Sequence, residues 1–411
     1  MYITRAMEQK VLRMSTFFKA VLVTGARQVG KTTMLRHLSK DRTYVSLDDT
    51  DALTLAREDP KLFFMRFKPP ILIDEVQKAP ELFPYIKILC DESDEKGQFW
   101  LTGSEQYSMM ANITESLAGR VGIMTLYPLS YQEINGITFD APLDLSLEGL
   151  MHREAQSKPF DENTIFDVIW RGGMPQVQGA TTEELTAYFS SYVSSYLMRD
   201  VARIGGVSDE VRFLKFLSAC AANVAEQLNI NNLATVAEVS APTAKNWLAL
   251  LERLHIVRLL QPYFNNKFKR LAKTPKLYFT DTGFCAYLAK WLSRDVLKSG
   301  NAAGHYFENF ALMELIKDLD YSTQNYDLTY FRDSNQKEVD LFLEKDGRIH
   351  PLEVKLSASP DRREVKKYSL LENNDIPRGE GGIICMSPTV IPITAQDCYI
   401  PVTLLLSLIH I

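Results

Sequence analysis

A glycine-rich stretch near the start of the chain has the residue types and spacing of a phosphate-binding loop. Residues 25–32 read GARQVGKT, a full match to G-x-x-x-x-G-K-[ST], and follow the apolar run at 21–24. The glycines let backbone N–H groups surround a phosphate, while Lys31 neutralises its oxygens and Thr32 can hold Mg²⁺. A chance match in a strand-to-helix turn is the alternative. The candidate nucleotide-binding residues are Gly25, Ala26, Arg27, Gln28, Val29, Gly30, Lys31, Thr32 and Thr33.

A pair of acids follows a second apolar run. Residues 71–75 read ILIDE, which is typical of a buried parallel strand that ends in Asp74 and Glu75. Because ligands bind at the carboxyl ends of parallel strands, Asp74 is predicted to orient Mg²⁺ and Glu75 to polarise an attacking water. The two acids could instead cap a helix. With the loop, they predict ATP and Mg²⁺ as cofactors.

Two weaker candidates come later in the same region. The stretch GQFWLTGSEQ, residues 97–106, predicts a third strand whose end would place Ser104 near a γ-phosphate or a water. Arg120 precedes another apolar run, and a loop arginine can stabilise transition-state charge in its own chain or in a neighbouring subunit. The second option would require a homo-oligomer. Equally, Arg120 could pair with an acidic neighbour.

The segments GARQVGKTT, ILIDEVQ, LTGSEQ and SLAGRVGIMTLYPLS together resemble prokaryotic AAA-type ATPases that carry a C-terminal domain of unknown function. In that family, the ATPase domain precedes a winged-helix region and a restriction-endonuclease-like end. The resemblance covers nearly the whole chain. It implies that Lys31, Thr32, Asp74 and Glu75 bind nucleotide and metal, together with Ser104 and Arg120.

After residue 128 the pattern of apolar residues becomes helical. The stretch RGGMPQV, residues 171–177, interrupts it with glycine and proline. This stretch is expected to pack in a core, and contact with the nucleotide is the alternative. Residues 136–205 are therefore assigned to a helical connector.

Three helical patterns, at residues 209–228, 230–239 and 240–254, precede two strand patterns at 255–264 and 276–281. This order predicts a winged helix-turn-helix over residues 206–290, whose third helix can enter a major groove. Its groove-facing candidates are Thr243, Lys245 and Asn246.

Between the two strand patterns, the segment NNKFKRLAKTPK, residues 265–276, is basic and contains no acid, although the whole chain carries a net charge of -5. Phosphates are the natural partners of such a patch, so nucleic acid is the predicted partner and DNA the expected type. The alternative is a protein-binding winged helix with a solvated loop. The basic residues are Lys267, Lys269, Arg270, Lys273 and Lys276.

A hairpin is predicted in the C-terminal part of the chain. Asp346-Gly347, flanked by β-type runs, is typical of a two-residue turn, and this turn pairs Asp340 with Glu353. Lys355 lies two residues further on the same face, and the opposite face is apolar. Two carboxylates and a lysine at one place can bind Mg²⁺ and position a water for attack on a phosphodiester.

This arrangement looks like the PD-(D/E)xK nuclease core. The supporting elements come in that order: a helix at 306–319, a strand at 328–332, the hairpin, a helix at 360–371 and a strand at 381–387. The resemblance implies Glu308, Asp340 and Glu353 as metal ligands and Lys355 as catalytic. An active nuclease, a degenerate nuclease-like fold and a solvated cluster with Glu338 opposite Lys355 all stay open.

The whole pattern predicts an α/β protein with a P-loop NTPase domain of AAA-like parallel sheet at residues 1–135, then the helical connector, the winged helix and a restriction-endonuclease-like domain at 300–411. No apolar run is long enough to cross a membrane and the first residues lack a signal peptide, so a cytoplasmic protein is expected. The five scattered cysteines are expected to be reduced. ATP hydrolysis would control action on nucleic acid. The rival function is a nucleotide-dependent switch that binds a protein partner and has an inactive nuclease-like module.

Overall fold

The computed structural model divides the chain into two compact units, residues 1–129 with 253–255 and residues 130–252 with 256–411. The first boundary lies near the predicted end of the ATPase domain, whereas the three later predicted domains share the second unit. The residues that the structure describes are 2–104, 117–205, 207, 209–263, 274–322, 325–333, 336–373 and 376–405.

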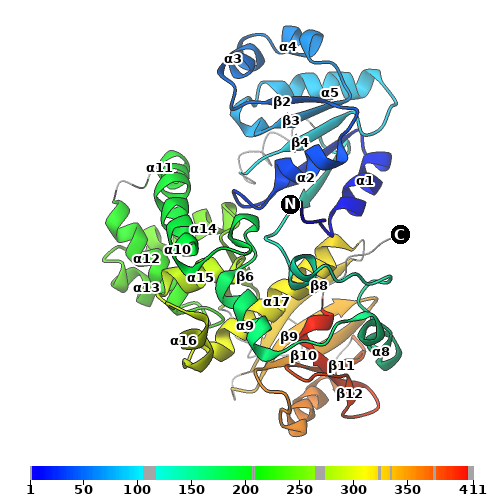
Figure 1. Cartoon of the computed structure of the whole chain (residues 1–411), viewed down its shortest axis with the longest axis vertical. Helices are drawn as coiled ribbons and strands as arrows, with labels where there is room; N and C mark the ends of the chain where they lie inside the picture. Colours follow the sequence, from blue (N-terminus) through cyan, green and yellow to red (C-terminus); the bar gives the residue numbers. More distant parts are fainter. Residues whose placement is uncertain are drawn as a thin grey trace. The chain divides into compact units, whose positions relative to one another are not determined.

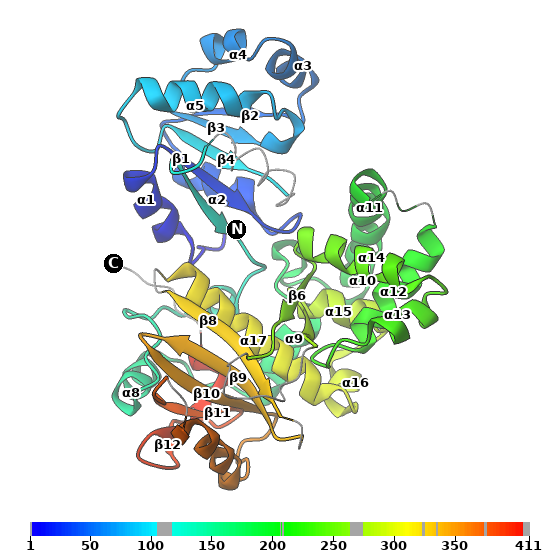
Figure 2. The same ribbon diagram turned by 180° about the vertical axis from the view of Figure 1, so that it is seen from behind.

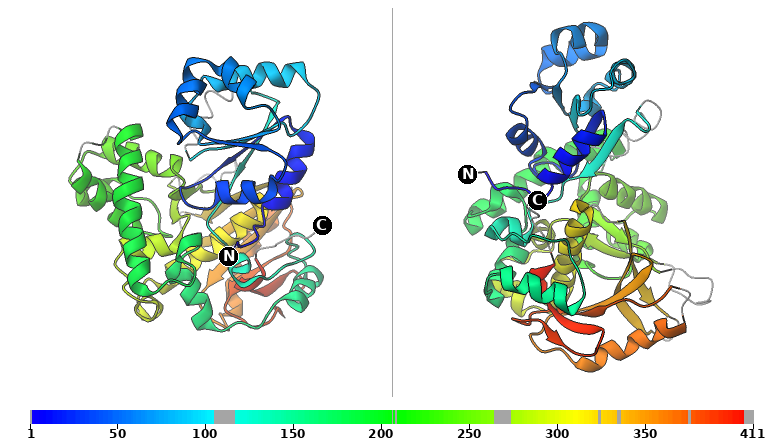
Figure 3. Two further views of the ribbon diagram at one scale, coloured as in Figure 1. Left: turned by 45° about the horizontal axis from the view of Figure 1, so that its top comes forward. Right: turned by 90° about the vertical axis from the view of Figure 1, so that its right-hand side faces the viewer.

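The first unit is built on a parallel sheet of order β2-β3-β4-β1-β5, as the apolar runs predict (Figure 1). Every residue of β1, β3 and β4 is buried, and helices lie on both sides of the sheet (left view of Figure 3). The strands are β1 (Ala20–Thr24), β2 (Thr43–Ser46), β3 (Ile71–Asp74), β4 (Phe99–Thr102) and β5 (Val121–Thr125). The helices are α1 (Glu8–Phe17), α2 (Lys31–Leu38), α3 (Thr50–Glu58), α4 (Pro60–Arg66) and α5 (Leu82–Glu92).

The strand order decides which side chains can meet. Strand β4 lies between β1, which leads into the glycine-rich loop, and β3, which ends in Asp74. All three strands run in the same direction, so their carboxyl ends share one edge of the sheet. Residues at the end of β4 therefore stand between the loop and the acids.

The second unit begins with helices α7 (Tyr131–Asn135), α8 (Leu147–Gln156), α9 (Glu162–Arg171), α10 (Thr182–Ser191) and α11 (Met198–Gly205). The predicted break at residues 171–177 follows α9 and packs in the core of this unit. The backbone N–H of Gly173 donates to Oδ2 of the buried Asp281 at 2.8 Å. A Cβ at Gly172, where φ is +80°, would lie 2.4 Å from Oδ1 of Asp281, so a glycine is needed there.

Next come α12 (Glu210–Ala222), α13 (Ile230–Val236) and α14 (Ala241–Arg253), followed by an antiparallel pair of strands, β6 (Val257–Leu260) and β7 (Lys276–Phe279). The three helices and two strands predicted for a winged helix are thus present in the expected order. The assignment of this region as a winged helix stays a prediction.

The remainder of the chain forms a mixed sheet of order β12-β13-β11-β10-β9-β8 (Figure 2). Helix α17 (Ala303–Tyr321) packs against β10 and is buried along almost its whole length. The helix predicted at 360–371 is present as a 3₁₀ stretch, Arg362–Asn373. The other elements are α15 (Thr282–Leu288), α16 (Arg294–Ser299), β8 (Tyr326–Arg332), β9 (Glu338–Lys345), β10 (Arg348–Lys355), β11 (Gly381–Cys385), β12 (Ile391–Pro392) and β13 (Asp397–Pro401).

The hairpin between β9 and β10 has the predicted register. Its turn residues, Asp346 and Gly347, have φ of +51° and +71°, as a two-residue hairpin turn with two left-handed residues requires. The ladder pairs Lys345 with Arg348 and continues to Leu341 and Leu352. The turn chemistry therefore decided the register locally.

Both faces of this hairpin are buried, including the acidic face, on which Phe342 and Pro351 predict partial cover. Phe342 and Ile349, on the face that carries the carboxylates, pack in one cluster with Tyr368 of the 3₁₀ stretch. This stretch contacts β9, β10 and β11. The acids on that face are consequently enclosed rather than solvated.

The five cysteines are unpaired and buried, in agreement with the expected reduced state. None of the described helices combines the length and the apolar character that a bilayer-crossing segment needs.

Candidate active site

The glycine-rich loop joins β1 to α2 and depends on glycine at both ends. Gly25 has φ of +138°, and a Cβ there would lie 2.2 Å from the carbonyl oxygen of Leu126. Gly30, with φ of +96°, directly precedes α2. Gln28 also has a positive φ, +63°. The loop thus curls tightly against the segment after β5 and leads into the positive end of α2.

Lys31 directs its ammonium group into this curl. The side chain is buried, and Nζ donates to the carbonyl oxygens of Gly25 and Ala26 at 2.9 and 2.8 Å. The Thr32 hydroxyl donates to Oδ1 of Asp74 at 2.6 Å. The structure therefore links the predicted loop and the predicted acid directly. Thr33 is exposed on the same helix.

An arginine that sequence reasoning missed braces the loop. Arg5 is buried and donates to the carbonyl oxygens of Val29 and Tyr127, both at 2.7 Å. It therefore ties the loop to the segment that follows β5. No local signal marks Arg5, because its partners lie far from it in the sequence.

Hydroxyl groups from three elements surround Asp74 at the end of β3. Oδ1 accepts hydrogen bonds from Thr32 and from Thr102, and Oδ2 accepts one from Tyr44 at 3.3 Å. Burial and the charge of Asp74 both raise the pKa of Tyr44, so this phenol stays a donor. The contacts of Thr102 and Tyr44 with Asp74 were not predicted, since only the strand order brings these residues together.

Glu75 takes a backbone conformation that directs it toward β4. Its φ is +59°, and its N–H donates to Oγ1 of Thr102 at 3.0 Å. The carboxylate accepts hydrogen bonds from Nε2 of Gln77 and from Oγ of Ser104, the latter at 3.3 Å. Such an uncommon conformation is typical of functional positions. Glu75 occupies the N-cap position of the short helical turn that follows, but its side chain makes no capping hydrogen bond, so capping by the carboxylate is not observed.

Arg120 does not reach this site within its own chain. It precedes β5 at the amino-terminal end of the strand, where its carbonyl accepts from the N–H of Ala20. At about 3.3 Å per residue, it lies roughly 15 Å from the edge that carries the loop. Its guanidinium instead pairs with both carboxylate oxygens of Asp91, at 2.6 and 3.1 Å. The prediction of a role in cis is therefore wrong, and the acidic-neighbour alternative is what the structure shows.

The site thus combines a tightly curled loop, a buried ammonium group, a hydroxyl in contact with a carboxylate, and a second carboxylate held nearby. The Thr32–Asp74 pair fits Mg²⁺, which prefers few protein oxygens and completes its shell with phosphates and water. Residues 17–135 match the family model described as an AAA domain. This region is therefore similar to AAA-type ATPase domains.

Other comparisons extend beyond the ATPase domain. Two family models described as domains of unknown function, DUF8612 and DUF4143, match residues 162–295 and 303–405. Over 357 residues, 86% of this chain, the sequence is 29% identical to the uncharacterized proteins Rv2008c of Mycobacterium tuberculosis and Mb2031c of Mycobacterium bovis, of which it covers 74%. The Walker-type ATPase PABY2304 of Pyrococcus abyssi is 15% identical, with a TM-score of 0.44 over 70% of this chain and 96% of that chain.

Outside the ATPase domain, the groove-facing candidates lie at the start of α14. Lys245 and Asn246 are exposed, whereas Thr243 is half-buried and exchanges a 2.8 Å hydrogen bond with the hydroxyl of Ser240. Lys267, Lys269 and Arg270 lie outside the described residues. Lys276, expected in the same surface patch, is only 4% exposed, so that expectation is wrong.

Lys276 instead lies among the acids of the C-terminal sheet. Its Nζ is 2.7 Å from Oε1 of Glu338, 3.0 Å from Oε1 of Glu308 and 3.5 Å from Oδ1 of Asp340. The hydroxyl of Tyr278 also donates to Glu308, at 2.6 Å. We call Lys276, Glu308, Glu338 and Asp340 the lysine-centred cluster. Burial opposes the charge of Lys276, but the carboxylates outweigh it and raise the pKa of this ammonium.

Glu353 and Lys355 form a neighbouring group. Oε1 of Glu353 accepts from Lys355 at 2.6 Å and from Lys367 at 2.8 Å. Oδ2 of Asp340 accepts from the N–H of Val354 at 2.9 Å, which joins the two groups. Burial, followed by the charge of Asp340, raises the pKa of Glu353 to about 7, and the same two causes raise that of Glu308 to about 7.

The predicted three-carboxylate metal site is not formed. Glu308, Asp340 and Glu353 do converge, but among the described residues no group of three or more His, Cys, Asp or Glu side chains is arranged to hold a metal ion. The ammonium group of Lys276 contacts both Glu308 and Asp340 instead, and Glu353 pairs with lysines of its own. The alternative of a solvated cluster is also wrong, because Asp340 and Glu353 are buried and Glu338 pairs with Lys276 rather than Lys355.

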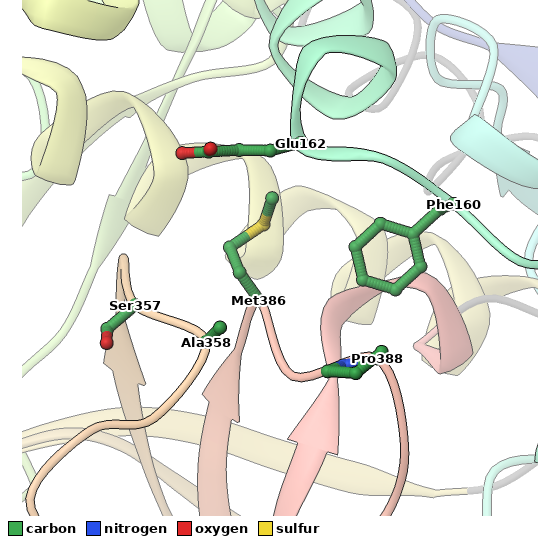
Figure 4. A pocket seen from close by; sticks show the side chains of 6 residues that line it. All are labelled: Phe160, Glu162, Ser357, Ala358, Met386 and Pro388. Carbon is green, nitrogen blue, oxygen red and sulfur yellow. The ribbon is translucent and has the colours of Figure 1, made fainter.

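A small cavity of about 180 Å³ lies beyond the carboxyl ends of β10 and β11 (Figure 4). Its lining contains none of the predicted site residues. It is bordered by Phe160, Glu162, Ser357, Ala358, Met386 and Pro388. Glu162 pairs there with Lys298 at 3.0 Å, so the only acid of the lining already has a partner.

Proposed function

We propose that this chain is a Mg²⁺-dependent ATPase whose nucleotide state controls the binding of DNA by the region of α12–α14. The observation that carries the first half is the direct contact between Thr32 and Asp74 beside a positioned Glu75. Phosphoryl transfer needs positioning and charge stabilisation more than covalent help, and these residues supply both.

Each side chain has a distinct role in this proposal. The loop N–H groups and Lys31 bind the β- and γ-phosphates, and Thr32 and Asp74 hold the Mg²⁺ that neutralises them. Glu75 orients the attacking water. The contacts from Gln77 and Ser104 hold the Glu75 carboxylate in place before the nucleotide arrives.

ATP turnover by Lys31→Ala and Glu75→Gln, with Lys61→Ala as the control, tests these roles. We expect Lys31→Ala to lose nucleotide binding. We expect Glu75→Gln to bind ATP but to hydrolyse it at least ~100-fold more slowly, as is found for other enzymes when a group that stabilises charge in the transition state is removed. Lys61→Ala, which removes an exposed lysine of α4 outside the loop, should keep full activity. Turnover by Glu75→Gln at the rate of the unmodified protein would contradict the assignment.

The second half rests on α14. Lys245 and Asn246 project into solvent from the first turns of this helix, where a recognition helix contacts base edges and phosphates. The helix is held from behind by buried residues, among them Trp247 and Leu251. A rigid helix with an exposed cation and an exposed amide is suited to DNA, which would be the partner.

A mobility-shift assay in the presence of ATP and of ADP tests DNA binding. We expect Lys245→Ala/Asn246→Ala to weaken binding and to reduce the salt dependence by about one phosphate contact. Lys96→Ala, which removes an exposed lysine from the ATPase domain, is the matched control. No binding by the unmodified protein in either nucleotide state would favour the second candidate.

That second candidate is a nucleotide-dependent switch that binds a protein partner and has no nuclease chemistry. The lysine-centred cluster favours it over cleavage, because the acids that a nuclease would present to metal already contact Lys276. Both candidate functions require an oligomer only if Arg120 acts on the nucleotide of a neighbouring subunit. Sedimentation with ATP and with ADP would detect such an assembly.

A further inference from the structure

Lys276 reaches the nuclease-like sheet from a different part of the fold. It is the first residue of β7, and its neighbours in the cluster come from α17 and β9. Its backbone pairs with Leu260 on one side and with Gln227 on the other, so the start of the side chain is held in place. The ammonium group also lies 5.5 Å from the ring centroid of Tyr330.

We propose that the ammonium group of Lys276 is the resident cation of the acidic cluster, and that it holds the place that a divalent metal would need. The nuclease-like module is then metal-free. It works as an electrostatic latch that fastens the β6–β7 pair to α17 and β9, and not as a phosphodiester-cleaving centre.

The hydrogen-bonding capacity of the lysine matches its surroundings. An ammonium group has three donors and no acceptor, and three carboxylates lie within 3.5 Å of Nζ. Buried carboxylates are costly unless they are paired, so a cation is required at this position. Lys276 meets that requirement from within the chain.

Every acid of the two groups has a cationic partner. Lys276 serves Glu308 and Asp340, while Glu338 also contacts Nη1 of Arg332 at 3.1 Å. On the other side of Asp340, Glu353 is bound by Lys355 and Lys367. No acid of this set is left without a positive neighbour.

A metal ion and the ammonium group would exclude one another. Mg²⁺ binds carboxylate oxygens at about 2.1 Å, which would bring it within about 4 Å of Nζ if both shared these acids. Two cations at that separation repel strongly in a buried site. A metal could therefore bind only after Lys276 had withdrawn, and its backbone pairing and the Tyr330 ring oppose this. The same reasoning predicts that removal of Lys276 creates a divalent-cation site.

Mn²⁺ binding by the full chain without nucleotide, followed by electron paramagnetic resonance, tests the proposal. We expect the unmodified protein and Asp340→Asn to bind the same number of Mn²⁺ ions, and Lys276→Ala to bind one more. The double variant Lys276→Ala/Asp340→Asn should lose that additional ion. Mn²⁺ bound by the unmodified protein but lost in Asp340→Asn or in Glu338→Gln would overturn the proposal.

Thermal unfolding gives a second readout. Lys276→Met leaves Glu308 and the buried Asp340 without the ammonium group that they contact, so we expect the Tm of the second unit to fall by roughly 10 °C. Lys215→Met, which breaks the exposed pair with Glu238, is the matched control and should change Tm little. Equal stability of Lys276→Met and the control would refute the latch. The Mn²⁺ comparison of the unmodified protein with Asp340→Asn still decides the metal question if Lys276→Met does not fold.

Discussion

Thr102 offers a sharp test of how the ATPase domain positions its acids. The side chain is fully buried between the loop strand and the acidic strand. Its hydroxyl donates to Oδ1 of Asp74 and accepts from the N–H of Glu75 at 3.0 Å. One small group therefore sets the orientation of both acids. Thr102→Val keeps the shape of the side chain and removes both hydrogen bonds, whereas Thr102→Ser keeps the hydroxyl and removes only a methyl group.

The contacts of Thr102 predict different losses of unfolding free energy and of kcat for the two variants. In Thr102→Val, the Asp74 carboxylate loses a charge-assisted bond and the Glu75 N–H is left buried without its acceptor. Together these losses cost on the order of 3–5 kcal/mol of unfolding free energy. In Thr102→Ser, the lost methyl group costs about 1 kcal/mol. Misplacement of the acids by about 1 Å in Thr102→Val should lower kcat by roughly 100-fold.

Steady-state ATP hydrolysis, binding of a fluorescent nucleotide and thermal unfolding of the two variants measure these effects. We expect Thr102→Val to lose most turnover and to unfold at least ~10 °C lower, and Thr102→Ser to stay close to the unmodified protein. If Thr102→Val matched Thr102→Ser in both kcat and stability, the hydroxyl would not position the acids and this reasoning would be refuted.

Three further outcomes are expected. Gln77→Leu should lower kcat roughly 10-fold or more, because Glu75 loses a charge-assisted hydrogen bond. Nucleotide affinity should change little. A loss of affinity as large as the loss of kcat would contradict a purely positioning role for Gln77. Arg120→Ala should change kcat less than about twofold in dilute protein, since the partner of Arg120 is Asp91. A loss of about 1000-fold is typical of an arginine that stabilises the transition state, and would show that Arg120 acts on a neighbouring subunit. Burial raises the pKa of Glu353 to about 7, so the folded chain binds this proton more tightly than the unfolded chain, and the contribution of Glu353 to stability falls as pH rises from about 5 to 8. Glu353→Gln should flatten that part of the Tm profile, and an unchanged profile would assign it to other groups.

Local chemistry explains which parts of the fold were predictable. The loop at 25–32 was recognisable because two glycines, a lysine and a hydroxyl occur within eight residues, and the contacts of Lys31 with Gly25 and Ala26 are local. The register of the β9–β10 hairpin was predictable because Asp346 and Gly347 both accept positive φ. The burial of its acidic face was predictable only in part. Phe342 and Pro351 on that face indicate partial cover, but the covering 3₁₀ stretch comes later in the chain and carries only Tyr368 and a few other apolar residues.

The same division holds for the sites. The sequence by itself determined that a phosphate-binding loop, an acidic strand end and a charged hairpin exist, since each depends on neighbours within a few residues. Only the tertiary structure decided that Thr102 stands between the loop and the acids, that Arg120 lies at the opposite edge of the sheet, and that Lys276 enters the acidic cluster. These three depend on strand order and on contacts between distant segments, which short-range patterns do not encode.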